Sequence, residues 1–241
     1  MKTLQEIIDR GKRIVFFGGA GVSTESGIPD FRSTDGLYNQ KYDYPPEIIL
    51  SDTFFYTHTE EFFRFYRDKM LFPDAQPNAA HRKLFELEQA GKLRGIVTQN
   101  IDGLHRMAGN KRVYELHGTV YENTCLECGK KYGLDFMLNS TGVPRCACGG
   151  VIKPDVVLYG ESLDQNTIIG ACREISQADV LIVAGTSLMV QPAASFLDYF
   201  SGRDLVVINR DATSADSRAS LVLHERVGEV LGKIEVRPPK V

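Results

Sequence analysis

The feature that most constrains the fold is a glycine-rich turn that directly follows an apolar run. The run Ile14–Phe17 is rich in strand-forming residues and predicts a buried strand. The glycines of residues 18–21 allow a tight turn, and Ser23, Thr24 and Ser26 offer caps for a short helix. A strand that leads through glycines to a helix N-terminus exposes unpaired N–H groups, so this segment predicts a phosphate site.

The turn is an incomplete match to the dinucleotide-binding fingerprint G-x-G-x-x-G. Gly19 and Gly21 fit the fingerprint, but Thr24 stands where the third glycine belongs. On this segment alone, a nucleotide site and a strand–helix turn without a ligand are about equally supported. The remaining motifs therefore have to decide between them.

Composition and charge exclude several classes of protein. The chain has 241 residues, 43% hydrophobic and 24% charged, which is ordinary for a globular protein with one large core and a small second domain. A formal net charge of −3 argues against a broad nucleic-acid surface, which is normally basic. The N-terminus is charged where a signal peptide is apolar, and the apolar run from Val180 to Leu197 is interrupted by Gly185 and Pro192. We therefore expect a cytoplasmic protein with no membrane span and no nucleic-acid partner.

Four of the five cysteines lie in one segment with spacing close to that of a zinc ribbon. Cys125 and Cys128 form a C-x-x-C pair, and Cys146 and Cys148 follow as a tighter C-x-C pair. Four thiolates complete a tetrahedral shell, so we expect structural Zn²⁺ and no catalytic water on the metal. Four unmetallated thiols are the weaker alternative, because the segment contains little apolar material to fold around. Cys172 stands alone in a helical pattern and is expected to be a small buried residue.

Polar side chains follow two predicted strands at the points where the strands end. The strand 95–98 leads into Gln99, Asn100 and Asp102, and the next short strand leads into His117. The carboxyl ends of parallel strands share one sheet edge, which is where open α/β sheets bind ligands. A helix cap explains Asn100 or Asp102 but not the whole set. A lone histidine is more often a packing residue, but at this edge an imidazole suits a general base.

Other strand ends repeat the pattern. The most hydrophobic strand, 180–184, ends in the glycine–hydroxyl turn 185–187. The strand 205–208 ends in Asn209-Arg210-Asp211, where a polar side chain is well placed to bind ribose hydroxyls. Residues 156–158 are also expected to form a strand.

The strands alternate with predicted helices, which fall at 3–11, 51–70, 78–89, 165–177 and around 230–231. This alternation predicts a doubly wound, Rossmann-like parallel sheet of the α/β class. We expect three segments to form this larger nucleotide-binding domain: 1–33, 78–119 and 154–241. A helical insert at 34–77, crowded with phenylalanines, and the zinc ribbon at 120–153 form the smaller domain.

Seven motifs spread over the chain combine into one pattern. They are Gly19–Ser23 with Gly27–Arg32, Thr98–His105, Leu116–Gly118, the cysteine quartet, Pro154–Val157 with Tyr159–Glu161, Gly185–Ser187, and Ile208-Asn209. Over residues 3 to 232 this pattern resembles the bacterial-type sirtuins. Two features depart from the family: Tyr159 stands where many members have phenylalanine, and Cys146-x-Cys148 is one residue tighter than the usual pair.

The resemblance implies an NAD-dependent protein-lysine deacetylase that consumes NAD instead of using it for hydride transfer. In sirtuin-like chemistry the acetyl oxygen of the substrate lysine attacks the ribose carbon that bears nicotinamide. His117 would then act as general base on a ribose hydroxyl, and Asn100 would orient the ribose and a water. The products would be the free lysine, O-acetyl-ADP-ribose and nicotinamide, which is also an expected inhibitor.

The resemblance also implies an NAD pocket. Asp102 and Ile101 would hold the nicotinamide amide, and Phe31 in a closing loop at 28–32 would shield the reacting carbon. The implied NAD-binding residues are Ala20, Gly21, Thr24, Phe31, Arg32, Gln99, Asn100, Ile101, Asp102, His117, Gly185, Thr186, Ser187, Asn209, Asp211 and Val227.

The implied partner is an acetyl-lysine protein or peptide, which would add a strand between residues 157–161 and the loop 189–191. The implied substrate-binding residues are Val157, Leu158, Tyr159, Gly160, Glu161 and Val190. A succinyl or malonyl group would need a cation, usually from a tyrosine–arginine pair. No arginine occurs between Arg32 and Arg64, so we expect acetyl and other uncharged acyl groups to be preferred.

Three other functions use parts of the same pattern. A hydride-transferring dehydrogenase would share the sheet, but the third fingerprint glycine and the acidic residue on the second strand are not evident. An ADP-ribosyltransferase would share NAD cleavage and would label protein without removing acetyl groups. A zinc-ribbon binding module for nucleic acid or protein is the non-enzymatic alternative, and the net negative charge and the lack of a Lys/Arg stripe around the cysteines argue against nucleic acid.

Overall fold

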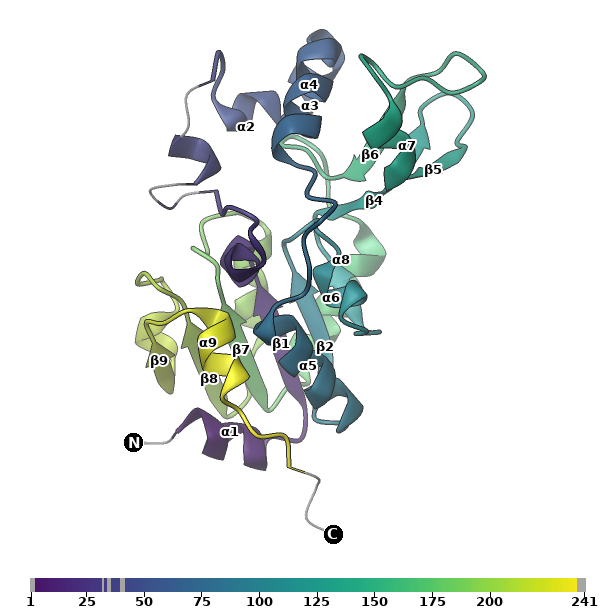
Figure 1. The fold of residues 1–241 in the computed structure, drawn as a ribbon. Helices are drawn as coiled ribbons and strands as arrows, with labels where there is room; N and C mark the ends of the chain where they lie inside the picture. The colour runs from purple at the N-terminus through teal and green to yellow at the C-terminus, as the bar shows by residue number, and fades with distance from the viewer. Residues whose placement is uncertain (1–2, 32, 34–35, 40–41, 238–241) are drawn as a thin grey trace.

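The centre of the fold is a six-stranded parallel sheet (Figure 1). The computed structural model describes residues 3–31, 33, 36–39 and 42–237. Neighbouring strands run parallel in the order β3-β2-β1-β7-β8-β9. These strands are β1 (Ile14–Gly18), β2 (Leu93–Thr98), β3 (Val113–Glu115), β7 (Val180–Ala184), β8 (Asp204–Ile208) and β9 (Leu221–Leu223). The predicted doubly wound α/β class is confirmed.

Helical layers cover both faces of the parallel sheet. In β1, Ile14 and Phe16 belong to the core formed with α1, α5 and α9, whereas Val15 and Phe17 belong to the core formed with α8 and a 3₁₀ segment. Burial on both faces explains why the strands are continuous apolar runs. The covering elements are α1 (Leu4–Arg10), α5 (Ala79–Gln89), α8 (Gln165–Ser176), α9 (Val227–Gly232) and the 3₁₀ segment Ala193–Tyr199.

The strand order reverses beside β1. The chain passes from β1 outward to β2 and β3, and later returns to β7 on the other side of β1 before continuing to β8 and β9. A crevice at the carboxyl ends of such strands is the usual ligand site of an open α/β sheet. Short elements follow several of these strand ends: α6 (Leu104–Met107) and the 3₁₀ turns Ala20–Val22, Thr24–Ser26 and Asp216–Arg218.

A second, antiparallel sheet and several helices form the upper part of Figure 1. Its strand order is β5-β4-β6, and phenylalanines of α3 and α4 share a core with this sheet. The crowded phenylalanines of the helical insert are therefore core residues. The elements are the 3₁₀ turn Leu37–Asn39, α2 (Pro46–Ile49), α3 (Asp52–Thr57), α4 (Thr59–Lys69), β4 (Gly118–Cys125), β5 (Lys131–Gly133), α7 (Leu134–Asn139) and β6 (Ile152–Val156).

Two predicted elements differ from the structure. The helix predicted at 51–70 is interrupted at His58, whose backbone is not helical (φ −133°, ψ 50°) and whose ring stacks on Phe54. The hydroxyl of Thr59 donates to the Phe55 carbonyl (2.8 Å) at this break. The strand predicted at 156–158 ends at Val156 as part of β6, which pairs with β4 in the small sheet and not with the parallel sheet.

The predicted domain division stays a prediction, although all six parallel strands lie inside the segments assigned to the larger domain. Strands β4 and β6 each cross a predicted boundary, at 119/120 and at 153/154. Within the described ranges, no helix combines the length and the apolarity needed to cross a bilayer.

Candidate active site

Two glycine turns meet where the strand order reverses. The Gly21 N–H donates to the Gly185 carbonyl (2.8 Å), and the Gly19 N–H donates to the Ala184 carbonyl (3.1 Å). A Cβ on Gly21 would lie 2.8 Å from the Gly185 Cα, and Gly185 itself has a φ of +59°. Side chains cannot occupy this contact, so the two backbones approach closely only because both turns carry glycine.

The first turn continues as two 3₁₀ turns that present backbone donors. The N–H groups of Ala20 and Thr24 donate no hydrogen bond to any residue that the structure describes, and both residues line the main cavity. Such groups are suited to phosphate oxygens. The predicted side-chain caps are wrong: neither 3₁₀ turn has one. Ser23 bonds instead to groups of the neighbouring strand end.

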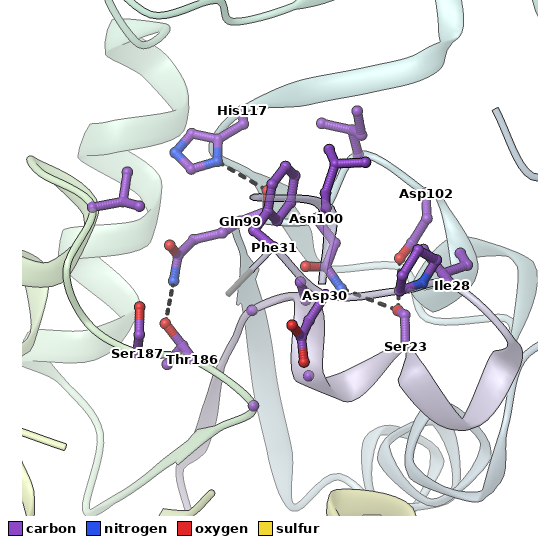
Figure 2. Close-up of a pocket in the computed structure, with 18 of the residues that line it drawn as sticks. Ser23, Ile28, Asp30, Phe31, Gln99, Asn100, Asp102, His117, Thr186 and Ser187 are labelled. Atoms are coloured by element: carbon purple, nitrogen blue, oxygen red, sulfur yellow. Dashed lines mark hydrogen bonds between the residues drawn. The ribbon is translucent and has the colours of Figure 1, made fainter. Parts of the chain in front are cut away.

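Ser23 joins two of the polar residues that follow β2. The Ser23 hydroxyl donates to Asp102 Oδ2 (2.6 Å) and accepts from Asn100 Nδ2 (3.1 Å). Asp102 Oδ1 accepts from the N–H of Leu104 (2.9 Å), the first residue of α6. Burial raises the pKa of the Asp102 carboxyl above its ordinary value, and the hydrogen bonds from Ser23, Leu104 and Asn100 oppose this rise. Figure 2 shows Asn100, Asp102 and Ser23 gathered in this network.

His117 faces the same cavity from the end of the next strand. Its Nδ1 lies 2.9 Å from the Gln99 carbonyl oxygen. A dashed line marks this contact in Figure 2. A carbonyl only accepts, so Nδ1 carries the proton and Nε2 is the basic nitrogen. Burial lowers the pKa of His117, and the bond to Gln99 partly offsets this effect. The imidazole is therefore neutral near pH 7, as a general base requires.

The position of His117 depends on the next residue. Gly118 has a φ of +76°, and a Cβ there would lie 2.0 Å from the Asp155 carbonyl oxygen. The His117 carbonyl accepts from the Val157 N–H (2.9 Å). Because β4 and β6 meet at this glycine, His117 is fixed beside the start of the segment 157–161.

A cavity of about 380 Å³ connects these groups. This is the size and setting expected of a small-molecule site. Every implied NAD-binding residue that the structure describes lines it: Ala20, Gly21, Thr24, Phe31, Gln99, Asn100, Ile101, Asp102, His117, Gly185, Thr186, Ser187, Asn209, Asp211 and Val227. All implied substrate-binding residues also line it: Val157, Leu158, Tyr159, Gly160, Glu161 and Val190. Arg32 lies outside the described residues.

The polar ends of the cavity have their own hydrogen bonds. Gln99 Nε2 donates to the Thr186 hydroxyl (3.0 Å), which connects the ends of β2 and β7. Asn209 Nδ2 donates to the Asp211 carbonyl (2.8 Å) at the end of β8. The amide and hydroxyl groups therefore lie at three strand ends, those of β2, β7 and β8, which suits an extended ligand with hydroxyls.

Several lining residues were not predicted from the sequence. Asp30 and Arg210 form an ion pair (3.2 Å) between the loop after the first turn and the end of β8. Lys69 at the end of α4 also lines the cavity, and its Nζ lies 2.9 Å from Asp68. Lys69 is thus a cation of the helical insert that reaches the cavity, and it lies beyond the arginine-free stretch between Arg32 and Arg64. Ser23 belongs to the first motif, but its partners are distant in the chain.

The four clustered cysteines do not line this cavity and lie beside the three-stranded antiparallel sheet. Their sulfur atoms all lie within 4.8 Å of one another, with Cys125 and Cys148 at 3.5 Å and Cys128 and Cys146 at 3.6 Å. Four sulfurs around Zn²⁺ at about 2.3 Å form a tetrahedron with edges of about 3.8 Å. The donor set and spacing therefore fit structural Zn²⁺, and the tight C-x-C pair does not prevent the cluster. Cys172 is half-buried against the core of α8.

Comparisons with known proteins place this geometry in a family. A family model described as Sir2 family matches residues 19–192. NAD-dependent protein deacetylases from Clostridium acetobutylicum and Clostridium perfringens are each 56% identical to the chain, over 95% and 96% of both sequences. A Sir2–p53 peptide–NAD⁺ structure has a TM-score of 0.84 at 40% identity over 96% of both chains. A Sir2 structure with deacetylated p53 peptide and 3′-O-acetyl ADP ribose has a TM-score of 0.87 at 39% identity over 94% of both. The chain belongs to the Sir2 family.

Proposed function

We propose that this protein is an NAD-dependent protein-lysine deacetylase. The observation that carries the proposal is a neutral His117 whose Nδ1 is held by the Gln99 carbonyl, in a cavity that extends to the two glycine turns. Relatives with the same activity in their names match nearly the whole chain. Acetyl-lysine proteins are the proposed substrates, NAD the co-substrate, and nicotinamide a product and an inhibitor.

The residues around the glycine turns bind NAD in this proposal. The N–H groups of Ala20 and Thr24 hold phosphate oxygens, and Asn209 holds the adenosine ribose. Asp102, with Ile101, holds the nicotinamide amide. Ser23 positions the Asp102 carboxyl through its 2.6 Å hydrogen bond. NAD supplies an electrophilic ribose carbon when nicotinamide leaves.

His117 is the general base in this proposal. Because burial lowers its pKa, the imidazole stays neutral to lower pH than an ordinary histidine, and Nε2 accepts a proton from a ribose hydroxyl. Asn100, held by Ser23, orients the ribose and a water. The proposed role of Phe31 is to cover the reacting carbon and exclude other water.

The acyl peptide lies along residues 157–161 and reaches Val190 on the opposite side. The Tyr159 N–H and carbonyl are occupied by Leu50 and Asp52, so the peptide pairs with other backbone groups of this segment. Acetyl and other uncharged acyl groups are the proposed choice. The cysteine quartet holds Zn²⁺ in a structural role, and a cytoplasmic location stays a prediction.

Mass spectrometry of an acetylated peptide incubated with and without NAD tests the proposal. We expect NAD-dependent loss of the acetyl group, with release of nicotinamide. The variant His117→Ala should lose about 2 to 4 orders of magnitude in turnover. His58→Ala, a histidine that does not line the cavity, serves as the matched control.

Three outcomes would overturn the proposal or its residue assignment. NADH absorbance would indicate a dehydrogenase, and transfer of label from NAD to protein without deacetylation would indicate an ADP-ribosyltransferase. Near-normal turnover by a folded His117→Ala variant would show that His117 is not the general base.

A further inference from the structure

We propose that a hydrogen bond between Tyr38 and Tyr159 ties the loop that carries Phe31 to the peptide-binding segment. The two hydroxyl oxygens are 2.6 Å apart and connect residues 121 positions apart in the chain. Both side chains line the cavity, one from the small domain's 3₁₀ turn and one from the segment after β6. The inference rests on the proposed function, since it assigns positioning residues to the same site.

The Tyr159 end of this connection is firmly anchored. The Tyr159 N–H donates to the Leu50 carbonyl (2.9 Å), and the Tyr159 carbonyl accepts from the Asp52 N–H (2.9 Å). The next residue, Gly160, has a φ of +96°, and a Cβ there would lie 2.6 Å from Asp52 Oδ1. The backbone that carries the Tyr159 ring is thus held between α2 and α3, so the ring extends from a fixed backbone position.

The Tyr38 end is joined directly to Phe31. The Tyr38 N–H donates to the Phe31 carbonyl (2.8 Å), and the Leu37 N–H donates to the Asp30 carbonyl (2.9 Å). The Tyr38 and Phe31 rings pack edge to face, with centroids 5.4 Å apart and an interplanar angle of 67°. Any constraint on Tyr38 therefore passes to the Phe31 backbone and ring.

This arrangement gives the hydroxyl of Tyr159 a function that a phenylalanine ring at the same place lacks. A phenylalanine would pack at the edge of the cavity, but it could not bond to the Tyr38 hydroxyl. The bond joins the proposed peptide side to the proposed NAD side. We therefore expect the two hydroxyls to favour the position of Phe31 in which both substrates are enclosed.

Single and double Tyr→Phe variants test this inference. The variants are Tyr38→Phe, Tyr159→Phe and the double variant, with Tyr199→Phe as an exposed control that does not line the cavity. The measurements are kcat and KM for NAD, from nicotinamide release at saturating acetyl peptide, together with Tm. Because Tyr159 is 40% exposed, the bond competes with water, and we expect each single variant to lower kcat/KM by about 2- to 5-fold.

The double variant separates a shared bond from two independent effects. If the hydroxyls act through each other, the double variant loses no more than either single variant. Multiplied losses in the double variant, or single variants equal to wild type, would overturn the inference. A fall in Tm with unchanged kcat/KM would assign the bond to stability alone and would also overturn it. Absence of nicotinamide release by the wild type would instead refute the proposed function.

Discussion

The contact between the two glycine turns predicts that Gly185→Ala is strongly destabilising. Gly185 has a φ of +59°, and an added Cβ would lie 2.4 Å from the Val22 nitrogen and 2.6 Å from the Gly21 carbonyl carbon. Both neighbours are backbone atoms, so neither can rotate away. The substitution therefore forces the turns after β1 and β7 apart.

The expected cost has two parts. A left-handed backbone costs an alanine about 1–2 kcal/mol, and overpacking of a tight contact costs about 1–3 kcal/mol more. The sum is about 2–5 kcal/mol of unfolding free energy, which lowers Tm by about 4–20 °C in a chain of this length.

Gly91→Ala is the matched control for the backbone part. Gly91 has a φ of +71°, but a Cβ there meets nothing within 4 Å. This variant should lose only the left-handed cost of about 1–2 kcal/mol. Urea unfolding and calorimetry of both variants measure the difference, and calorimetric titration with NAD should show weaker binding by the Gly185 variant alone. Equal destabilisation by the two substitutions would refute the argument that the turns must touch.

Three further predictions concern the site and the metal. Ser23→Ala removes a hydrogen-bond donor from Asp102 and should raise the pKa of that carboxyl further. The acid limb of the pH–activity profile should therefore move to higher pH. An acid limb at the same pH as in the wild type would contradict this prediction. Chelation of Zn²⁺ should unfold residues 120–153 and lower Tm, and unchanged stability after verified metal loss would count against a structural role. When the same peptide is compared with an acetyl and with a succinyl group on its lysine, the acetylated peptide should be turned over faster. If succinyl is preferred, Lys69→Met will show whether the Lys69 cation is responsible.

Much of the site could be predicted because it is built at strand ends. Strands β1, β2, β7 and β8 are apolar runs bounded by glycine or polar residues, and parallel strands bring their carboxyl ends to one edge. The residues that follow each run therefore had to gather there. The cysteine spacing predicted the sulfur cluster in the same way, because the two short turns need only face each other.

The contacts that escaped prediction depend on pairings between distant segments. Ser23 reaches Asp102 across 79 positions, and Tyr38 reaches Tyr159 across 121. The residues next to Ser23 in the sequence do not indicate this partner, because a serine after a glycine turn could equally well cap a helix. The break at His58 could not be predicted for the same reason. The apolar pattern of residues 51–70 is compatible with a continuous helix, and the stacking of the His58 ring on Phe54 is visible only in the structure.

The pairing of β4 with β6 has a consequence for how the protein works. His117 directly precedes β4, Val157 directly follows β6, and the two residues are hydrogen-bonded to each other. His117, the proposed general base, and Val157, at the start of the proposed peptide segment, are thus joined at the edge of the small sheet. The glycine turns belong to the parallel sheet. Gln99, whose carbonyl lies 2.9 Å from His117 Nδ1, also follows β2 of that sheet. His117 is therefore hydrogen-bonded to both sheets, and a rotation of one sheet against the other would have to break one of its two hydrogen bonds or move the histidine.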